Sequence, residues 1–283
     1  MTTLYVVATP IGNLEDLSAR AARVLREVTV VFAEDTRRSR TLMTHVGKTD
    51  TPIRRLDANV APEDVTALLA KIGTDEAIAV VTDAGTPSVS DPGSTVVALA
   101  RDRGFTIVPI PGPSAVVTAL SACGYALQAF SFVGFLPRAG VERAQALSKI
   151  ESSEDAIVFF ESPNRVAATL AELASRQPSR RAFIARELTK LHEELLEGTL
   201  NDLANIAAAR EWIGELTLVL APHKGLSARI GAEDVQRRID EALEAGSRPR
   251  DISEQLAFDT GWSKRELYQL VLARKSSRKA ERQ

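Results

Sequence analysis

Four carboxylates of this sequence stand where apolar, strand-like runs end and polar loops begin. They are Glu34, Asp35, Asp83 and Glu187. A carboxylate in such a position can accept a proton as a general base. Basic side chains near similar strand ends can bind anionic groups or stabilise a developing negative charge. These are Arg37, Arg165 and Lys190. The residue types therefore fit proton transfer beside an anionic group.

The same residues also fit structural roles. Glu34 and Arg37 are three positions apart, as are Glu187 and Lys190, which is the spacing of a local ion pair in a helical turn. Asp83 can brace its own loop through hydrogen bonds to the backbone. We expect residues 34–37 on the substrate side of a site, but the sequence does not single out one carboxylate as the base.

The loop at 82–93 follows an apolar run of the kind found in buried parallel strands. Ligands in open α/β sheets bind beyond the carboxyl ends of the strands. Gly85 lets the backbone approach a ligand closely, while Pro87 and Pro92 stiffen the loop. The spacing matches neither G-x-G-x-x-G nor G-x-x-x-x-G-K-[ST]. It therefore predicts the floor of a site for a small organic cofactor that is neither a dinucleotide nor a nucleoside triphosphate.

The elements that must position these loops alternate between strand and helix in the first 120 residues. Strand-like runs occupy 4–8, 28–33, 77–82 and 106–110, and helical segments occupy 16–26, 96–100 and 115–122. Each run ends in a polar or Gly/Pro-rich loop. This alternation predicts a parallel sheet covered by helices.

A second α/β unit is expected after a hinge at 124–131. Its strand-like runs are 132–136, 156–160, 182–186, 195–198 and 215–221, with helices near 142–150 and 165–176. Several runs follow one another closely, which favours more antiparallel pairing. We expect the deepest cleft between the two units, a common location for ligand sites.

The segment from about 225 onward has a different character. Helices are predicted at 232–244, 252–260 and 264–273, with a turn at 260–262 and a capping box at 263–266. The last twenty residues carry seven Lys or Arg against two Glu. A helix-turn-helix outline with Lys264 and Arg265 at the second helix favours contact with nucleic acid, and a purely structural helical cap is the alternative. The predicted domains are 1–123, 124–224 and 225–283.

Composition bounds the class of protein. The chain of 283 residues is 45% hydrophobic and 25% charged, with a net charge of −2, as expected for a globular protein with a substantial core. Cys123 is the single cysteine, so no intrachain disulfide can form. The histidines lack metal-ligand spacing, and we expect no metal site, no signal peptide and no membrane span. A cytoplasmic location is the resulting expectation.

Six segments in this order resemble the tetrapyrrole (corrin/porphyrin) methylase superfamily. They are 4–14 (LYVVATPIGNL), 33–37 (AEDTR), 82–87 (TDAGTP), 111–115 (PGPSA), 159–165 (FFESPNR) and 185–190 (ARELTK). The resemblance covers about residues 4–221 and extends to the tail. Within the superfamily, the chain is similar to the enzymes that methylate a cytidine 2′-hydroxyl of 16S ribosomal RNA.

The resemblance implies S-adenosyl-L-methionine as the methyl donor, bound between the two α/β units. Carried over by position, the implied cofactor contacts are Pro10, Ala84, Gly85, Thr86, Ser114, Ala115, Phe160, Glu161, Leu188 and Leu216. Adenine needs apolar walls and a carboxylate favours helix-terminal N–H groups, which agrees with these residue types. Phe160, Leu188 and Leu216 also fit plain core packing.

The implied reaction is an in-line displacement in which a ribose hydroxyl attacks a sulfonium methyl group. Positioning can supply much of the acceleration of such a reaction. A carboxylate within hydrogen-bond reach of the hydroxyl would help as general base, and the four carboxylates are the candidates. The cations Arg37, Arg165 and Lys190 then bind the flanking phosphates, and Lys264 and Arg265 contact RNA. The resemblance also implies the small ribosomal subunit as partner and a homodimer as the assembly.

Two other functions fit the sequence. A methyltransferase for a tetrapyrrole intermediate would use arginines for the macrocycle's carboxylates, and the candidates are Arg37, Arg38, Arg40, Arg138 and Arg165. A non-catalytic RNA- or ribosome-binding protein with a degenerate methylase body is the other. The basic C-terminal segment favours RNA over a small molecule, and an intact loop at 83–87 favours cofactor binding over a degenerate body.

Overall fold

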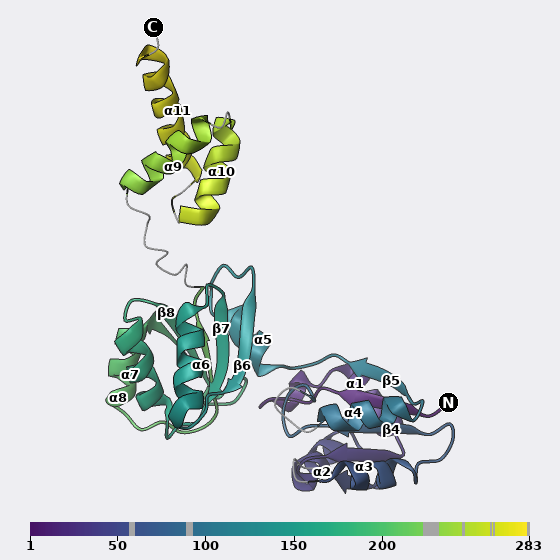
Figure 1. The fold of residues 1–283 in the computed structure, drawn as a ribbon. Coiled ribbons are helices and arrows are strands. Elements are labelled where there is room, and N and C mark those ends of the chain that lie inside the picture. Colours follow the sequence, from purple (N-terminus) through teal and green to yellow (C-terminus); the bar gives the residue numbers. More distant parts are fainter. Residues whose placement is uncertain are drawn as a thin grey trace.

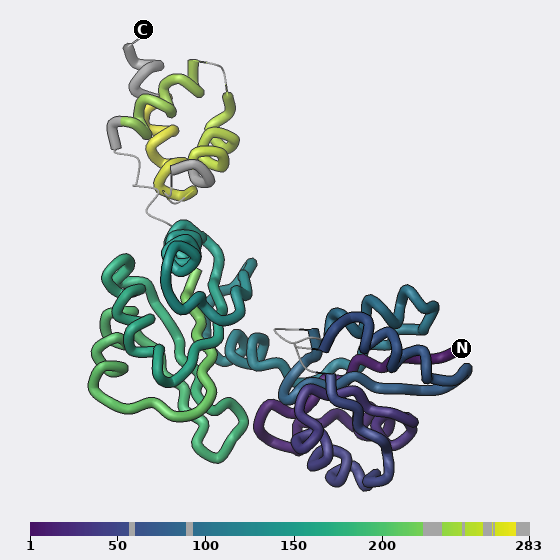
Figure 2. Tube along the Cα trace, turned by 60° about the horizontal axis from the view of Figure 1, so that its bottom comes forward, coloured from purple at the N-terminus to yellow at the C-terminus, as the bar shows by residue number. Residues whose placement is uncertain are grey.

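The computed structural model describes residues 1–56, 60–88, 93–222, 232–244, 247–260, 262 and 264–281. Two five-stranded sheets, each with helices, are followed by three further helices (Figure 1). Figure 2 follows the chain from the N-terminus in the first sheet unit, through the second, to the C-terminal helices. The predicted fold class, two α/β units with a small helical C-terminal part, is confirmed.

The first sheet has the strand order β3-β2-β4-β1-β5, and all neighbouring strands are parallel. Its strands are β1 (Thr3–Val7), β2 (Val30–Ala33), β3 (Ile53–Arg55), β4 (Ala77–Val81) and β5 (Thr106–Ile110). The carboxyl ends of parallel strands meet at one edge of a sheet, so the loops after β1, β2, β4 and β5 gather there.

Helices cover both faces of the first sheet because successive side chains of a strand point to opposite faces. On β4, Ala79 and Val81 pack with α1 and α2, while Ile78 and Val80 pack with α3 and α4. The bounds are α1 (Ala19–Glu27), α2 (Thr36–His45), α3 (Pro62–Leu69) and α4 (Gly93–Asp102). This double burial explains why the strands read as continuous apolar runs.

The second sheet has the order β6-β7-β10-β8-β9, with β6 and β7 parallel and the other neighbours antiparallel. Its strands are β6 (Phe130–Phe135), β7 (Ala156–Glu161), β8 (Arg181–Arg186), β9 (Glu194–Thr199) and β10 (Leu216–Leu220). The expected increase in antiparallel pairing is therefore confirmed.

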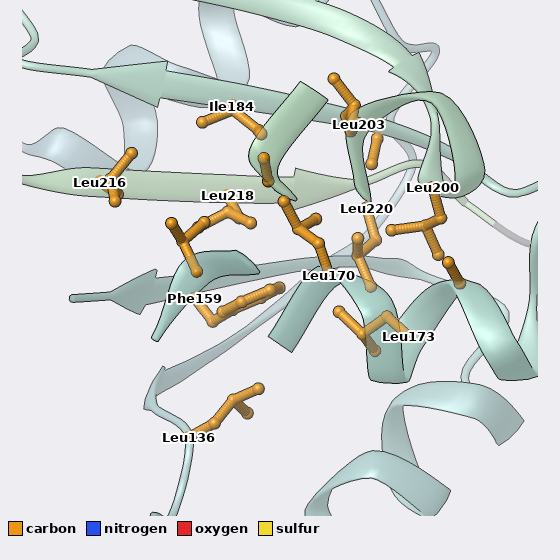
Figure 3. Packing of buried hydrophobic residues seen from close by; sticks show 14 of the residues in the cluster. Leu136, Phe159, Leu170, Leu173, Ile184, Leu200, Leu203, Leu216, Leu218 and Leu220 are labelled. Carbon is orange, nitrogen blue, oxygen red and sulfur yellow. The ribbon is translucent and has the colours of Figure 1, made fainter. Parts of the chain in front are cut away.

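One face of the second sheet packs against α6 (Gly140–Ser152), α7 (Val166–Arg176) and α8 (Leu200–Ala208). Figure 3 shows the tight cluster that results, in which Phe159 and Leu218 from the sheet lie close to Leu170 of α7. Every second residue of the strands enters this cluster. The helical face thus fixes the sheet that carries the second wall of the site.

The opposite face of the second sheet receives α5 (Ala115–Ala122), the helix that follows β5 of the first sheet. Val116, Ala119 and Leu120 of α5 pack with Val158 and Val219 of the second sheet. Ile11, from the loop after β1, joins the same cluster. These contacts join the two units through a shared apolar core.

The C-terminal helices are α9 (Ala232–Glu244), α10 (Pro249–Thr260) and α11 (Lys264–Glu281). They form a core of their own from Val235, Ile239, Ile252, Leu256, Leu267 and Val271. The predicted capping box begins at Ser263 and the predicted turn includes Gly261, and both residues lie outside the described part. The domain boundaries at 123/124 and 224/225 stay predictions.

Several local expectations need correction. The helix expected at 16–26 begins at Ala19, because Leu14–Asp16 form a 3-10 turn and the Ser18 hydroxyl caps α1 by accepting from the Ala21 amide. Residues 36–45, for which no helix was predicted, form α2. The sequence analysis also missed β3, α3 and α8, and α11 continues to Glu281.

No helix within the described ranges is long and apolar enough to cross a membrane.

Candidate functional site

A cavity of about 410 Å³ lies between loops of the two sheet units. The first unit contributes Ile11, Glu34, Arg38, Thr82, Asp83, Ala84, Gly85, Thr86, Ser114, Ala115 and Val116. The second contributes Phe135, Phe160, Glu161, Ser162, Pro163, Gly214, Glu215, Leu216 and Thr217. The first group comes from the carboxyl ends of parallel strands. The second group comes together because antiparallel pairing sets Leu216, at the start of β10, opposite Glu161, at the end of β7.

The loop after β4 is held as a floor by bonds to its neighbours. Thr9 and Gly85 exchange two backbone hydrogen bonds of 2.8 and 3.0 Å, and Thr86 Oγ1 donates to the Pro113 carbonyl at 3.1 Å. Gly85 has φ +83°, which side chains rarely adopt, and an added Cβ would lie 3.4 Å from Ile11 Cγ2. The glycine therefore permits this backbone conformation, whereas the space around it would accept a Cβ in ordinary contact.

The N-terminus of α5 lies at the same wall. Ser114 is the N-cap residue, its hydroxyl makes no capping bond, and both Ser114 and Ala115 line the cavity. The first amides of a helix have no intrahelical partner and favour negative charge. A carboxylate of a bound ligand suits this place.

Of the four predicted carboxylates, Glu34 and Asp83 line the cavity. Asp83 Oδ1 accepts from the Asp35 amide at 2.9 Å, and Oδ2 lies 3.8 Å from Nε of Arg38. Asp83 thus braces the end of β2 and still presents its carboxylate at the wall. The two readings of this residue, loop brace and chemistry, are compatible in the structure.

Asp35 and Glu187 are not part of the cavity lining and are occupied by local partners. Asp35 caps α2 and binds Arg37, whose hydrogen bonds lower the pKa of Asp35 to about 2. Partial burial opposes ionisation of Glu187, but hydrogen bonds from Lys190 and the Glu215 amide outweigh it and leave its pKa below the usual value. Neither carboxylate is poised to take a proton near neutral pH.

Three predicted cations also lie outside the cavity lining. Arg37 is largely exposed in its pair with Asp35, and Lys190 binds Glu187 and Glu215 at 2.8 and 3.0 Å. Arg165 Nε lies 3.2 Å from Oε1 of Glu161. Their assignment to flanking phosphates stays a prediction.

Most of the predicted cofactor contacts lie at the cavity. These are Ala84, Gly85, Thr86, Ser114, Ala115, Phe160, Glu161 and Leu216. Pro10 is not in the lining, and Leu188 is buried in the apolar core between the units. The Glu161 carboxylate is turned away into the protein, since its side chain is 0% exposed and accepts from Thr169 Oγ1 at 2.7 Å.

The site residues predicted from the methylase resemblance do not include several residues of the lining, and Arg38 was predicted only for a tetrapyrrole substrate. Thr82, Ser162 and Pro163 belong to the quoted motifs, so those segments carried a signal for them. Arg38 lies in the first turn of α2, while Glu34 precedes the N-cap residue Asp35. No motif or spacing in the sequence indicated that Phe135 and Gly214 line the cavity.

Lys264 and Arg265 begin α11 in the C-terminal helical unit and are not in the cavity lining. Lys264 Nζ lies 2.8 Å from Oε2 of Glu254 on α10, and Arg265 is exposed. Across the described part of the chain, no three His, Cys, Asp or Glu side chains are grouped so that they can hold a metal ion.

Comparison with known proteins gives consistent similarities. The family profile of the Tetrapyrrole (Corrin/Porphyrin) Methylases matches residues 3–204. A Mycobacterium tuberculosis protein named Ribosomal RNA small subunit methyltransferase I is 42% identical over 275 residues, covering 95% of this chain and 94% of the relative. A Halalkalibacterium halodurans protein of the same name is 36% identical over 277 residues, with coverage of 95% and 94%.

Solved structures share the fold at lower identity. A uroporphyrin-III C-methyltransferase from Thermus thermophilus, complexed with S-adenosylhomocysteine, is 17% identical with a TM-score of 0.56, covering 77% of this chain and 97% of that one. A cobalt precorrin-4 methyltransferase of cobalamin biosynthesis is 18% identical with a TM-score of 0.58, with coverage of 77% and 94%.

Proposed function

Because this chain belongs to the tetrapyrrole (corrin/porphyrin) methylase family, we propose that it transfers a methyl group from S-adenosyl-L-methionine to a cytidine 2′-hydroxyl of 16S rRNA. The observation that carries the proposal is the similarity, over at least 94% of the chain, to relatives named Ribosomal RNA small subunit methyltransferase I. The cavity supplies the groups that such a reaction needs.

The residues at the cavity fit the cofactor. Gly85 leaves room for close backbone approach, the α5 N-terminus at Ser114 and Ala115 favours a carboxylate, and Phe160 and Leu216 offer apolar walls for an adenine. S-adenosyl-L-methionine supplies an electrophilic methyl group on a sulfonium sulfur. The protein's task is to hold this group in line with the attacking oxygen and to exclude water.

The protein must also remove the proton of the ribose hydroxyl. Glu34 and Asp83 are the two predicted carboxylates at the cavity wall, and we assign the base to this pair. The hydrogen bond from the Asp35 amide fixes Asp83, and Arg38 beside it can stabilise the oxygen as its charge develops. A base held rigidly at the wall needs no reorganisation when substrate arrives.

A tetrapyrrole substrate is the second candidate, and coverage argues against it. The solved tetrapyrrole enzymes match 94–97% of their own length but leave about a fifth of this chain unmatched. The relatives named for ribosomal RNA cover almost all of it. Identities of 17–21% with the tetrapyrrole enzymes carry the fold alone.

The proposal extends to three features that follow from the resemblance. We propose contact of the C-terminal helices with rRNA, a homodimer, and action in the cytoplasm. The exposed basic residues of α11 support the first.

The test is transfer of labelled methyl from S-adenosyl-L-methionine to small-subunit particles that lack this modification. Digestion of the RNA to nucleosides should yield labelled 2′-O-methylcytidine. Label on another nucleoside or on a base atom would contradict the position of methylation. Label in uroporphyrinogen and none in RNA would overturn the proposal.

A further inference from the structure

Phe135, the last residue of β6, presents an aromatic ring at the cavity wall. The residue is 58% exposed and belongs to the cavity lining. Its ring lies beside that of Phe160, with centroids 5.5 Å apart and an interplanar angle of 56°. Much of the ring therefore meets solvent, although an aromatic side chain is stabilised by burial.

The backbone turns this ring outward through a local irregularity. The pairing of β6 with β7 shifts register between Phe132 and Phe135, and Gly134 between them has φ +67°. The next residue, Leu136, is buried in the core of the second unit. Phe135 is thus exposed between two fixed positions rather than at the tip of a loop.

Two arginines hold the backbone directly after the ring. Arg165 Nη2 donates to the carbonyls of Leu136 and Pro137 at 2.7 and 3.3 Å. Arg143 Nη1 donates to the Pro137 carbonyl at 3.0 Å. Both guanidiniums are anchored in turn, Arg165 on Glu161 and Arg143 on α7. Because this backbone is already held, little backbone entropy is lost when a ligand covers the ring.

We propose that Phe135 is the platform on which the nucleobase of the target nucleotide stacks. The inference rests on the proposed function. An enzyme that acts inside folded RNA must take its target nucleotide out of the stack, and proteins commonly receive such bases on aromatic faces. Phe135 belongs to the second unit, while Glu34 and Asp83 lie on the first. A nucleoside across the cavity thus has its base at one wall and its sugar oxygen at the other.

The other aromatic ring in the described lining is less available. Phe160 is flanked by Phe132 at 5.0 Å and by Phe135 at 5.5 Å, both between ring centroids. Phe160 also packs against the apolar core shared by the two units, where an adenine wall is expected. We therefore assign the Phe160 ring to cofactor binding and the Phe135 ring to substrate binding.

The experiment compares full-length variants on small-subunit particles that lack the modification. The variants are Phe135→Ala, Phe135→Leu and Phe135→Tyr, with Phe130→Ala as the matched control. Phe130 is 47% exposed at the other end of β6 and is not in the cavity lining. Steady-state methyl transfer gives kcat and KM for the particle, and calorimetry gives the affinity for S-adenosylhomocysteine.

Loss of stacking should lower kcat/KM for the particle by about 5-fold to 100-fold in Phe135→Ala. Phe135→Leu should lose nearly as much, because it keeps apolar volume without a π face. Phe135→Tyr and Phe130→Ala should stay close to the wild type. The affinity for S-adenosylhomocysteine should be unchanged in all four, which also shows that each variant is folded.

Three outcomes would overturn the inference. Full activity of Phe135→Leu would show that apolar packing alone is needed. A parallel loss of S-adenosylhomocysteine affinity would assign the ring to the cofactor's adenine. Wild-type activity of Phe135→Ala would show no role, and in all these cases the proposed function survives. If the wild type itself methylates no rRNA, the proposed function and the inference fail together.

Discussion

The two sheet units use their charged residues in opposite ways. In the first unit, Glu34, Arg38 and Asp83 are set at the cavity wall by the ends of β2 and β4 and the start of α2. In the second, Glu161 at the end of β7 pairs with Arg165, and its carboxylate is fully buried rather than exposed to the cavity. The first unit thus presents several charged side chains to the cavity, whereas this pair of the second unit is used within the protein.

This difference follows from the architecture of the sheets. Parallel strands end together, so the first sheet gathers several polar loops at one edge. In the second sheet the end of β7 meets the start of β10, and the wall there is a continuous pair of strands. A wall of paired strands is rigid. Its side chains alternate between the core and the cavity, so only every second residue can face a ligand.

The strongest test of the comparison concerns the carboxylates of the first unit. One of the variants Glu34→Gln and Asp83→Asn should lower kcat by about 10²- to 10⁴-fold, the usual contribution of a general base. The affinity for S-adenosylhomocysteine should remain. Single-turnover methyl transfer, measured with saturating S-adenosyl-L-methionine, checks this.

Equal and small losses in both carboxylate variants would contradict a base at this wall. In that case positioning alone would account for the acceleration. The matched comparison is Glu187→Gln in the second unit. Because Glu187 is occupied by Lys190 and the Glu215 amide, its loss should alter stability more than kcat.

The next largest effect should come from the buried pair in the second unit. Glu161→Ala removes the acceptor of Thr169 Oγ1 and the partner of Arg165, and should lower the free energy of unfolding by about 3 kcal/mol. Urea denaturation measures the change. Glu161→Gln should cost less, because its single amide oxygen can still accept from one of these two partners, which use different oxygens of Glu161.

A partly exposed pair of the same unit serves as the control for Glu161. Glu151→Ala breaks the pair with Arg176, in which both side chains are one-third or more exposed, and should cost clearly less. An equal loss in the two alanine variants would mean that burial does not distinguish Glu161. The contrast between the two units would then disappear.

A smaller effect is expected in the C-terminal helices. The exposed Arg265 and Lys275 of α11 can be replaced by Gln without touching the core residues Leu267 and Val271. The double variant should bind small-subunit rRNA more weakly, and the slope of log affinity against log salt should fall by about 2. Cofactor affinity should be unchanged. If the slope of log affinity against log salt is unaltered, the C-terminal helices have a structural role and do not contact RNA through these residues.

The smallest effect concerns the cap of α2. Hydrogen bonds from Arg37 hold the pKa of Asp35 at about 2, below its usual value of 3.8. The carboxylate therefore stabilises the fold at pH values above 3.8, and this contribution disappears as the pH falls through about 2. Wild type should be more stable than Asp35→Asn at pH 5, and thermal unfolding should show the difference closing towards pH 2. A difference independent of pH would contradict this assignment.

Most of the first sheet could be predicted from the sequence because its strands are buried on both faces. Each of β1, β2, β4 and β5 appears as an apolar run that ends in a polar loop. The edge strand β3 has three residues, two of them Arg54 and Arg55, and gives no such signal. α2 was missed because its sequence is dominated by arginine and threonine, and tertiary packing of Leu42 and Met43 completes it.

Helix α8 was not predicted, although its first residues carry a sequence pattern typical of a helix start. Thr199 and Asp202 form a reciprocal capping box at its start. By contrast, no local pattern distinguishes Arg165, which binds backbone carbonyls, from Arg38, which lies at the cavity. Both arginines stand near strand ends, and the difference arises from which partners the fold brings within reach.

By itself, the sequence determined the parallel sheet, the glycine-containing floor of the site and the set of polar residues at strand ends. These features depend on local backbone preference and on burial pattern, which neighbouring residues encode. The tertiary structure alone decided which carboxylates reach the cavity, that Glu161 and Arg165 neutralise each other, and that Phe135 faces outward. Those outcomes depend on distances between segments far apart in the chain. Small shifts in these distances decide whether a charged side chain forms an ion pair within the protein or lies at the cavity.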